Sequence, residues 1–266
     1  MTKMIVLDLD ETLLRSDKTI SSYTETVLQK AREAGIKLVL ATGRPKRSSA
    51  PYYHRLQCDA LICHNGNIIL YGEQCISGPG VPIREAKRIL TFLQKKYPDK
   101  KLSVEIDDRI YANFDVSVIW GKTEEGKQML GSPAIVADFS CLTGESADKI
   151  LIELDSEEEY REVQNLLTPD LYAQSANGGK LCVVMNKSTS KLNAIKQLAE
   201  LWDISVSRIT AFGDDYNDIE MLCGCGTGVS MANAIPDVKE AADVVTGTNN
   251  DDGVAEYIMN RILSNK

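Results

Sequence analysis

An apolar run that ends in two aspartates, residues 4–14 (MIVLDLDETLL), constrains the fold of this chain more than any other feature. Residues 4–7 are all apolar, which is typical of a strand buried on both faces of a parallel sheet. Asp8 and Asp10 follow, and two carboxylates in a cleft repel one another unless a cation or a proton separates them. We therefore expect a hard divalent metal, with Asp8 ionised for attack and Asp10 able to carry a proton. If no other motif supported these two aspartates, the alternative would be an acidic turn with no catalytic role.

Strand-like and helix-like segments alternate in the first 71 residues and again after residue 186. Such alternation predicts parallel strands joined by helical crossovers. Ser22 can cap the first helix, with Glu25 completing a capping box and Gly35 ending the helix. The predicted strands of these two parts are residues 4–7, 36–41, 60–63, 68–71, 208–212, 226–231 and 244–245. The predicted helices after residue 186 include residues 191–202 and 253–263.

The middle of the chain has a different pattern. Residues 78–82 (GPGVP) read as a linker, and residues 83–97 follow as a charged amphipathic helix. The predicted elements beyond it are a hairpin at 102–114, a strand at 149–154, a helix at 156–167 and strands at 171–175 and 181–185. The fold class we predict is α/β, a Rossmann-like doubly wound parallel sheet core with an inserted α+β domain. The core comprises residues 1–81 and 187–266, and the insert comprises residues 82–186.

Composition narrows the classes of function. The 266 residues carry a formal charge of −8, which argues against a nucleic-acid surface. No apolar run approaches the ~20 residues of a membrane span, and the amino terminus does not resemble a signal peptide. Seven scattered cysteines and two histidines favour reduced thiols over disulfides or a zinc site. We therefore expect a cytoplasmic protein that binds neither nucleic acid nor membrane.

Chemically active side chains fall just past the carboxyl ends of predicted parallel strands. Asp8, Asp10, Thr42 and Asp214 occupy such positions, and Lys191 opens a helix. Because these ends share one edge of an open sheet, where ligands bind, the side chains can meet in one crevice. Carboxylates for a metal, a hydroxyl and an ammonium suit phosphoryl transfer. A serine triad is disfavoured, since neither histidine follows a strand with a serine partner.

Four motifs carry a resemblance to a known family. The motifs are Asp8-Leu-Asp-Glu-Thr, Ala41-Thr-Gly-Arg44, Ser190-Lys191, and Gly213-Asp-Asp-Tyr-Asn-Asp218 followed by Met221-Leu222. In this order along the chain, they resemble those of the haloacid dehalogenase superfamily of phosphohydrolases, and within it those of the Cof-like branch with a type IIB cap. They cover both halves of the core, and the insert stands where the family has its cap.

The resemblance implies a role for each matching residue. Asp8 is expected to be the nucleophile that forms an aspartyl-phosphate, and Asp10 the acid that protonates the leaving oxygen and then the base that activates water. The residues implied to bind the phosphoryl group are Thr42, Gly43, Lys191 and Asn217. The implied Mg²⁺ ligands are Asp8, the backbone carbonyl of Asp10, and Asp214, with Asp218 supporting the metal site.

The roles of several residues stay open at this point. The family usually has glycine after the motif lysine, whereas Leu192 stands here, which puts the approach of backbone to ligand in question. Arg44 and Asn65 can contact substrate or serve as cap and turn residues. Glu11 and Asp215 are expected at the surface.

These observations predict a Mg²⁺-dependent phosphatase of a small phosphorylated metabolite, such as a sugar phosphate or a phosphorylated cofactor. We expect a monomer or weak homodimer, with a lid that selects the leaving group through loops at residues 113–131 and 174–180. A phosphomutase on the same scaffold is an alternative. A non-enzymatic receiver-type phospho-switch is disfavoured, because its acidic pair and its phosphorylated aspartate occur in a different order.

Overall fold

The computed structural model of the chain describes residues 1–120, 126–127, 130–136, 138–176 and 178–264. The chain divides into two compact units. The first comprises Met1–Arg44, Ser49–Ile76 and Ser190–Lys266, and the second comprises Pro45–Ser48 and Ser77–Thr189. The predicted insert, residues 82–186, lies entirely inside the second unit. Of the loops predicted to select the substrate, residues 121–125, 128–129 and 177 lie outside the described residues.

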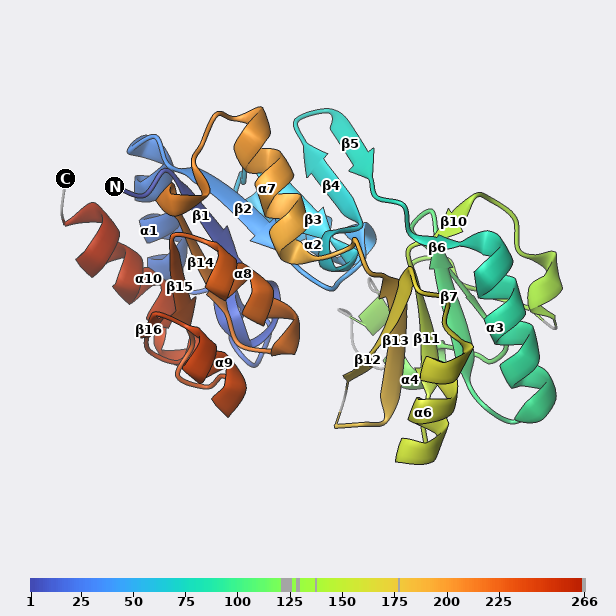
Figure 1. Ribbon diagram of the computed structural model, residues 1–266. Helices are drawn as coiled ribbons and strands as arrows, with labels where there is room; N and C mark the ends of the chain where they lie inside the picture. Colours follow the sequence, from blue (N-terminus) through green and yellow to red (C-terminus); the bar gives the residue numbers. More distant parts are fainter. Residues whose placement is uncertain (121–125, 128–129, 137, 177, 265–266) are drawn as a thin grey trace. The chain divides into compact units, whose positions relative to one another are not determined.

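The first unit is built on an eight-stranded sheet with the order β16-β15-β14-β1-β2-β3-β4-β5 (Figure 1). Strand β1 is fully buried and pairs in parallel with β14 and β2, whereas β4 runs antiparallel to β3. The strands are β1 (Met4–Leu7), β2 (Lys37–Ala41), β3 (Ala60–Cys63), β4 (Ile68–Tyr71), β5 (Gln74–Ser77), β14 (Ile209–Gly213), β15 (Thr227–Ser230) and β16 (Val244–Val245). The carboxyl ends of β1, β2 and β14 therefore lie next to one another.

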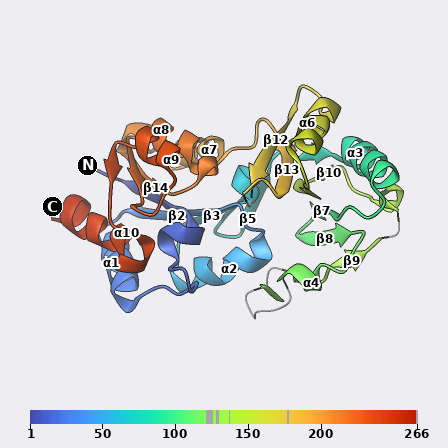
Figure 2. The same ribbon diagram turned by 90° about the horizontal axis from the view of Figure 1, so that it is seen from below.

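Helices cover both faces of this sheet, with α7, α8 and α9 on one face and α1, α2 and α10 on the other (Figure 2). The helices are α1 (Ser22–Glu33), α2 (Lys46–Arg55), α7 (Lys191–Leu201), α8 (Ile219–Gly224), α9 (Pro236–Ala241) and α10 (Gly253–Tyr257), which continues as a π-helix over Ile258–Leu263. One apolar core joins the two helical layers to the sheet. This arrangement confirms the predicted doubly wound α/β class.

Local predictions fail where the sequence signal is weak. The cap of α1 is Ser21, whose side chain accepts from Thr24 N–H, and not Ser22, which is the first helical residue. Helix α2 was not predicted, because its sequence contains Pro51 and lacks an apolar stripe. Strand β5 was missed because it is largely exposed and carries no continuous apolar run.

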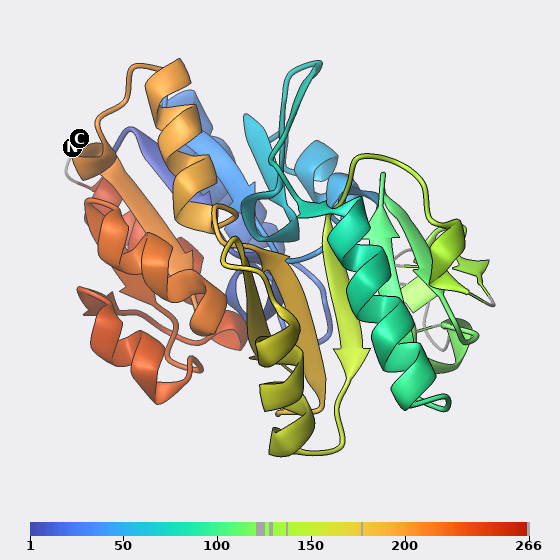
Figure 3. The same cartoon turned by 45° about the vertical axis from the view of Figure 1, so that its right-hand side comes forward.

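The second unit contains a six-stranded, mainly antiparallel sheet with the order β12-β13-β11-β7-β8-β9. Figure 3 shows α3 (Ile83–Lys96) and α6 (Glu157–Leu166) side by side on one face of it. Its strands are β7 (Leu102–Ile106), β8 (Arg109–Ala112), β9 (Ala134–Ile135), β11 (Lys149–Glu153), β12 (Leu171–Ala176) and β13 (Leu181–Asn186). Two short strands, β6 (Val81–Pro82) and β10 (Ser146–Ala147), pair separately, and a short helix, α4, spans Ser117–Trp120.

The two helices and the sheet of the second unit enclose a core of their own. Ile89 and Leu93 of α3 and Val163 of α6 pack with Ile150 of β11 and Val184 of β13. This is the α+β pattern predicted for the insert. All seven cysteines are free. No helix in the described part of the chain is long and apolar enough to cross a membrane.

Candidate active site

Asp8 is the first residue after β1, at the middle of the larger sheet. Its N–H donates to the carbonyl of Phe212 in β14 at 3.1 Å, which continues the strand pairing up to the aspartate. Only 6% of Asp8 is exposed. The chain then turns through a tight segment, Leu9–Leu13, so Asp8 and Asp10 point their side chains in different directions and meet different partners.

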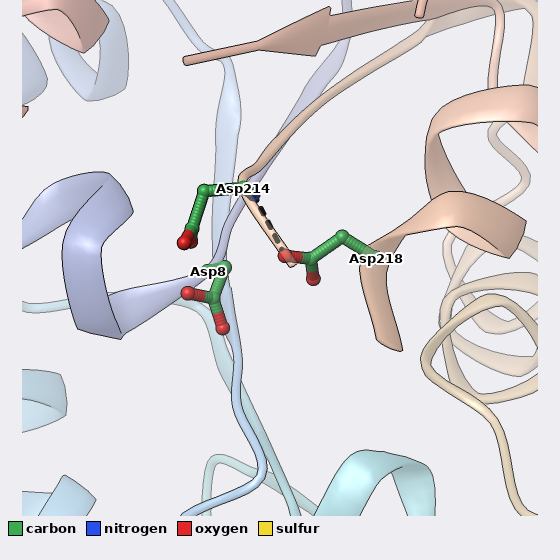
Figure 4. Close-up of side chains that lie close together, drawn as sticks. All are labelled: Asp8, Asp214 and Asp218. Carbon is green, nitrogen blue, oxygen red and sulfur yellow. Dashed lines mark hydrogen bonds between the residues drawn. The ribbon is translucent and has the colours of Figure 1, made fainter. Parts of the chain in front are cut away.

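Asp8, Asp214 and Asp218 form an acidic cluster at the carboxyl ends of β1 and β14 (Figure 4). One carboxylate oxygen from each lies within 4.8 Å of the others. Oδ2 of Asp218 accepts from the backbone N–H groups of Asp214 at 2.9 Å and Asp215 at 3.2 Å, which fixes the loop after β14. Asp215 in turn caps the short 3-10 turn Tyr216–Asp218. Local hydrogen bonds thus hold the loop after β14 in shape.

Lys191 brings a positive charge into this cluster. It is the first residue of α7, whose N-cap Ser190 accepts from Asn193 N–H. Its Nζ donates to Oδ1 of Asp8 at 2.6 Å and to Oδ1 of Asp218 at 2.7 Å. The Lys191 side chain is completely buried. A buried ammonium with two carboxylate partners is held in one geometry.

Burial and charge shift the pKa values of these groups. Burial raises the pKa of Asp8 well above its ordinary value, although Lys191 opposes the shift, and the charges of Asp218 and Asp214 raise it further. The pKa of Asp214 rises to about 7, chiefly through burial and against a hydrogen bond from Thr12. Burial lowers the pKa of Lys191, but the charges of Asp218 and Asp8 outweigh it and leave that pKa above its ordinary value.

The acidic cluster fits a hard divalent cation. Three carboxylates share one small space, and the ammonium of Lys191 contacts two of them, Asp8 and Asp218. Negative charge therefore exceeds positive charge. Burial is the main cause of the raised pKa of Asp8 and of Asp214, and a further cause is the repulsion between the carboxylates. An oxygen-ligated cation such as Mg²⁺ would relieve it. Of the predicted ligands, Asp8 and Asp214 lie in this cluster, and Asp218 braces it.

Thr42, Gly43 and Asn217 lie on two loops that Asn65 joins. Asn65 N–H donates to the Thr42 carbonyl at 3.0 Å, and Asn217 Nδ2 donates to Oδ1 of Asn65 at 2.9 Å. A side chain at Gly43 would meet that same Oδ1 at 3.1 Å. Thr42 is buried, and its Oγ1 accepts from Arg44 N–H. Asn65 thus links the loop after β2 to the loop after β14, and its contact with substrate stays a prediction.

The Asp10 side chain pairs with cations outside the acidic cluster. Arg44 donates to both of its oxygens, from Nε at 2.6 Å and from Nη2 at 2.5 Å, and Lys18 Nζ donates to Oδ1 at 3.0 Å. Although burial raises the pKa of Asp10, these two cations outweigh it and lower that pKa below its ordinary value. Lys18, which the sequence did not indicate, also donates to Glu11. The Glu11 side chain is half-exposed and paired with Lys18, whereas the sequence predicted that it faces solvent.

Two further residues shape the site. Thr12 Oγ1 donates to Oδ1 of Asp214 at 2.7 Å, a contact whose only signal in the sequence was its place in the first motif. Leu192 stands where the family usually has glycine, and its side chain packs against Gly224 of α8. A Cβ at Gly224 would come within 2.5 Å of Leu192 Cδ2, so the absence of a side chain there makes the room. Lys191 is undisturbed by this leucine.

The comparison with known families decides what this site belongs to. A family model of haloacid dehalogenase-like hydrolases matches residues 5–258, nearly the whole chain. The chain belongs to the haloacid dehalogenase-like hydrolases. The predicted family and fold are confirmed, and the curated relatives below support a hydrolase of phosphoric monoesters.

Curated and solved relatives of this hydrolase align over almost their full length. A 5-amino-6-(5-phospho-D-ribitylamino)uracil phosphatase of Bacillus subtilis is 29% identical over 96% of both chains. A pyridoxal phosphate phosphatase of Escherichia coli is 28% identical over 98% of this chain and 99% of its own. A solved haloacid dehalogenase-like hydrolase from Bacteroides thetaiotaomicron is 28% identical, with a TM-score of 0.84 and coverage of 97% and 99%. A solved subclass IIB sugar phosphatase is 26% identical, with a TM-score of 0.84 and coverage of 97% and 98%.

Proposed function

We propose that this hydrolase is a Mg²⁺-dependent phosphatase that removes the phosphoryl group from a small phosphorylated metabolite through an aspartyl-phosphate on Asp8. The observation that carries the proposal is the contact of Lys191 Nζ with Asp8 Oδ1 at 2.6 Å, inside a cluster of three carboxylates. A buried carboxylate held by an ammonium is placed to attack an electrophile. The charge that develops on the phosphoryl oxygens is met by nearby cations and donors.

The residues divide the chemistry between them. An oxygen of Asp8 attacks phosphorus, and the bond from phosphorus to the leaving oxygen breaks while Asp10 supplies a proton to that oxygen. Because Arg44 and Lys18 lower the pKa of Asp10 in this structure, Asp10 must separate from these cations and take up a proton before this step. Asp10 then accepts a proton from the water that hydrolyses the aspartyl-phosphate. Thr42, Gly43, Lys191 and Asn217 bind the phosphoryl oxygens in this proposal. Asp8, the carbonyl of Asp10 and Asp214 would hold Mg²⁺, which supplies positive charge next to the transferring group.

The substrate class rests on the relatives. One is named for a phosphorylated ribitylamino-uracil, one for pyridoxal phosphate and one for sugar phosphates. All three substrates are small, and each carries a phosphoric monoester. We propose a substrate of this class, with residues 82–186 acting as the cap that selects the leaving group.

The test is release of inorganic phosphate by the purified protein from a panel of sugar phosphates and phosphorylated cofactors, with and without Mg²⁺. The matched variant is Asp8→Asn, which keeps the size of the side chain and removes the attacking charge. We expect multiple turnovers by the wild type with at least one substrate and none by the variant. Transfer of the phosphoryl group to another position of the substrate, without release of phosphate, would instead indicate a mutase.

A further inference from the structure

The turn that follows Asp10 has a backbone shape that its own residues disfavour. Glu11 has φ 55° and ψ 8°, the left-handed conformation in which a Cβ meets the following carbonyl. Asp10 itself is extended, with φ −72° and ψ 131°, inside the same short segment. A backbone of this kind persists only where surrounding groups hold it. The contacts of Glu11 therefore fix the backbone position from which the Asp10 side chain extends.

Asn233 is one of the residues that hold this turn, from the loop after β15. Its Nδ2 donates to the backbone carbonyl of Glu11 at 2.7 Å, and its Oδ1 accepts from Asn249 N–H at 3.0 Å. Because a carbonyl can only accept and an N–H can only donate, both ends of the amide have an assigned direction. A carboxylate or an apolar side chain at position 233 could not make both bonds.

Asn249 holds the same turn at two more points. Its Nδ2 donates to the Leu14 carbonyl at 3.0 Å and to Oε2 of Glu11 at 3.1 Å. Only 3% of Asn249 is exposed, so these bonds are shielded from competing water. Together, Asn233 and Asn249 bond to the strained residue itself and to the end of the segment that contains it.

The loop that carries Asn233 also binds the segment after β14. The N–H of Met231 donates to the carbonyl of Gly213 at 3.1 Å, and the N–H of Ile235 donates to the carbonyl of Asp214 at 3.2 Å. One short loop is therefore bonded on one side to the backbone of Asp214 and on the other to the backbone of Glu11. It sets the spacing between the acidic cluster and the turn that bears Asp10.

We infer that Asn233 and Asn249 are positioning residues, which place Asp10 so that its proton reaches the leaving oxygen as Asp8 bonds to phosphorus. This inference rests on the proposed acid role of Asp10. Asn233 and Asn249 touch neither of the reacting groups, since their contacts run through Glu11 and Leu14. Their loss should therefore weaken proton transfer more than it weakens binding.

The experiment compares kcat/KM for two aryl phosphates, p-nitrophenyl phosphate and phenyl phosphate. Phenolate is the poorer leaving group and needs its proton more. The variants are Asn233→Ala, Asn249→Ala, Asp10→Asn and the control Asn260→Ala, which removes an exposed hydrogen bond to Glu256 far along the chain from the turn. Asn233 is exposed, so its variant is expected to fold even where the buried Asn249 variant does not. Thermal melting checks the fold of each protein.

For Asn233→Ala, we expect kcat/KM with phenyl phosphate to fall about tenfold more than with p-nitrophenyl phosphate, a part of the full contribution of an acid. Asp10→Asn should discriminate more strongly, and Asn260→Ala should not discriminate. If Asp10→Asn discriminates but Asn233→Ala lowers both values equally or not at all, the positioning role is overturned and the proposed function stands. If Asp10→Asn does not discriminate either, the acid role fails and takes this inference with it.

Discussion

The Nζ atom of Lys191 lies 2.6 Å from Oδ1 of Asp8, although 183 residues separate the two in the sequence. The same ammonium reaches Asp218 at 2.7 Å, so it joins the end of β1 to the loop after β14. Both carboxylates and the lysine are buried. The strength of this contact and the repulsion around it lead to the predictions that follow.

Replacing Lys191 by methionine should cost both activity and stability. The side chain keeps much of its length but loses the charge that compensates Asp8 and Asp218. Removal of one partner from a buried ion pair costs on the order of 3–5 kcal/mol, and loss of a charge-stabilising donor costs about 10²–10³ in rate. Thermal melting and kcat/KM measure the two effects. Lys196→Met, on the exposed face of the same helix, is the matched control. A Lys191 variant that behaved like this control would refute the assignment.

Asp10→Asn should separate the two chemical steps. Phosphoryl transfer from p-nitrophenyl phosphate needs little protonation, whereas hydrolysis of the aspartyl-phosphate still needs a base. We expect a burst of p-nitrophenolate of about one equivalent per site in stopped-flow absorbance, followed by slow turnover. With a sugar phosphate as substrate, the first step should be slow and no burst should appear. Equal losses with both substrates and no burst would leave Asp10 with a structural role only.

Removal and exchange of the metal test the acidic cluster. EDTA should abolish phosphate release, and Mg²⁺ should restore it. Ca²⁺ should inhibit, because it prefers more ligands at longer distances and would engage both oxygens of Asp8, which leaves no free lone pair for attack. Phosphate release in Ca²⁺ at the rate seen in Mg²⁺ would contradict this geometry.

The affinity for Mg²⁺ should depend on pH through Asp214. Burial raises the pKa of Asp214 to about 7 in the metal-free protein, so the carboxyl carries a proton below that pH and must lose it to bind a cation. The proton on Asp214 alone should make the affinity rise with pH up to about 7 and fall by up to about tenfold per pH unit below it, and the raised pKa of Asp8 acts in the same direction. Titration calorimetry in buffers of different ionisation enthalpy reports both the affinity and the proton released. An affinity that is independent of pH, without proton release, would contradict the shift.

Long apolar runs made most of the first unit predictable. β1 is entirely apolar and β2 and β14 are mostly apolar because both faces of the sheet are covered, and their ends place Asp8, Thr42 and Asp214 near one another. The same reasoning could not find α2 or β5, whose side chains are less buried and whose spacing shows no period. The direction of a side chain could not be predicted from the sequence either. In the structure, the Asp10 carboxylate points toward Arg44 and Lys18, which the sequence did not indicate.

The sequence also did not predict contacts between residues that lie far apart along the chain and carry no strong signal by themselves. Asn233 and Asn249 belong to none of the motifs found in the sequence, and only the folded chain brings them to Glu11. Leu192 shows the converse. Its departure from the family pattern left the neighbouring backbone in question, whereas in the structure Gly224 provides the space for its side chain. Leu192 on α7 is thus accommodated by Gly224 on α8.

The central claim is that Asp8 carries the phosphoryl group, and the most direct test is to trap it there. Asp10→Asn protein is mixed with p-nitrophenyl phosphate and Mg²⁺, quenched within the burst and reduced with borohydride, which converts an aspartyl-phosphate to homoserine. Peptide mass spectrometry then locates the change, with Asp8→Asn protein as the control. We predict homoserine at position 8 and none in the control. A phosphorylated Asp8→Asn protein, homoserine at another aspartate, or turnover without any trapped intermediate would contradict the proposed mechanism.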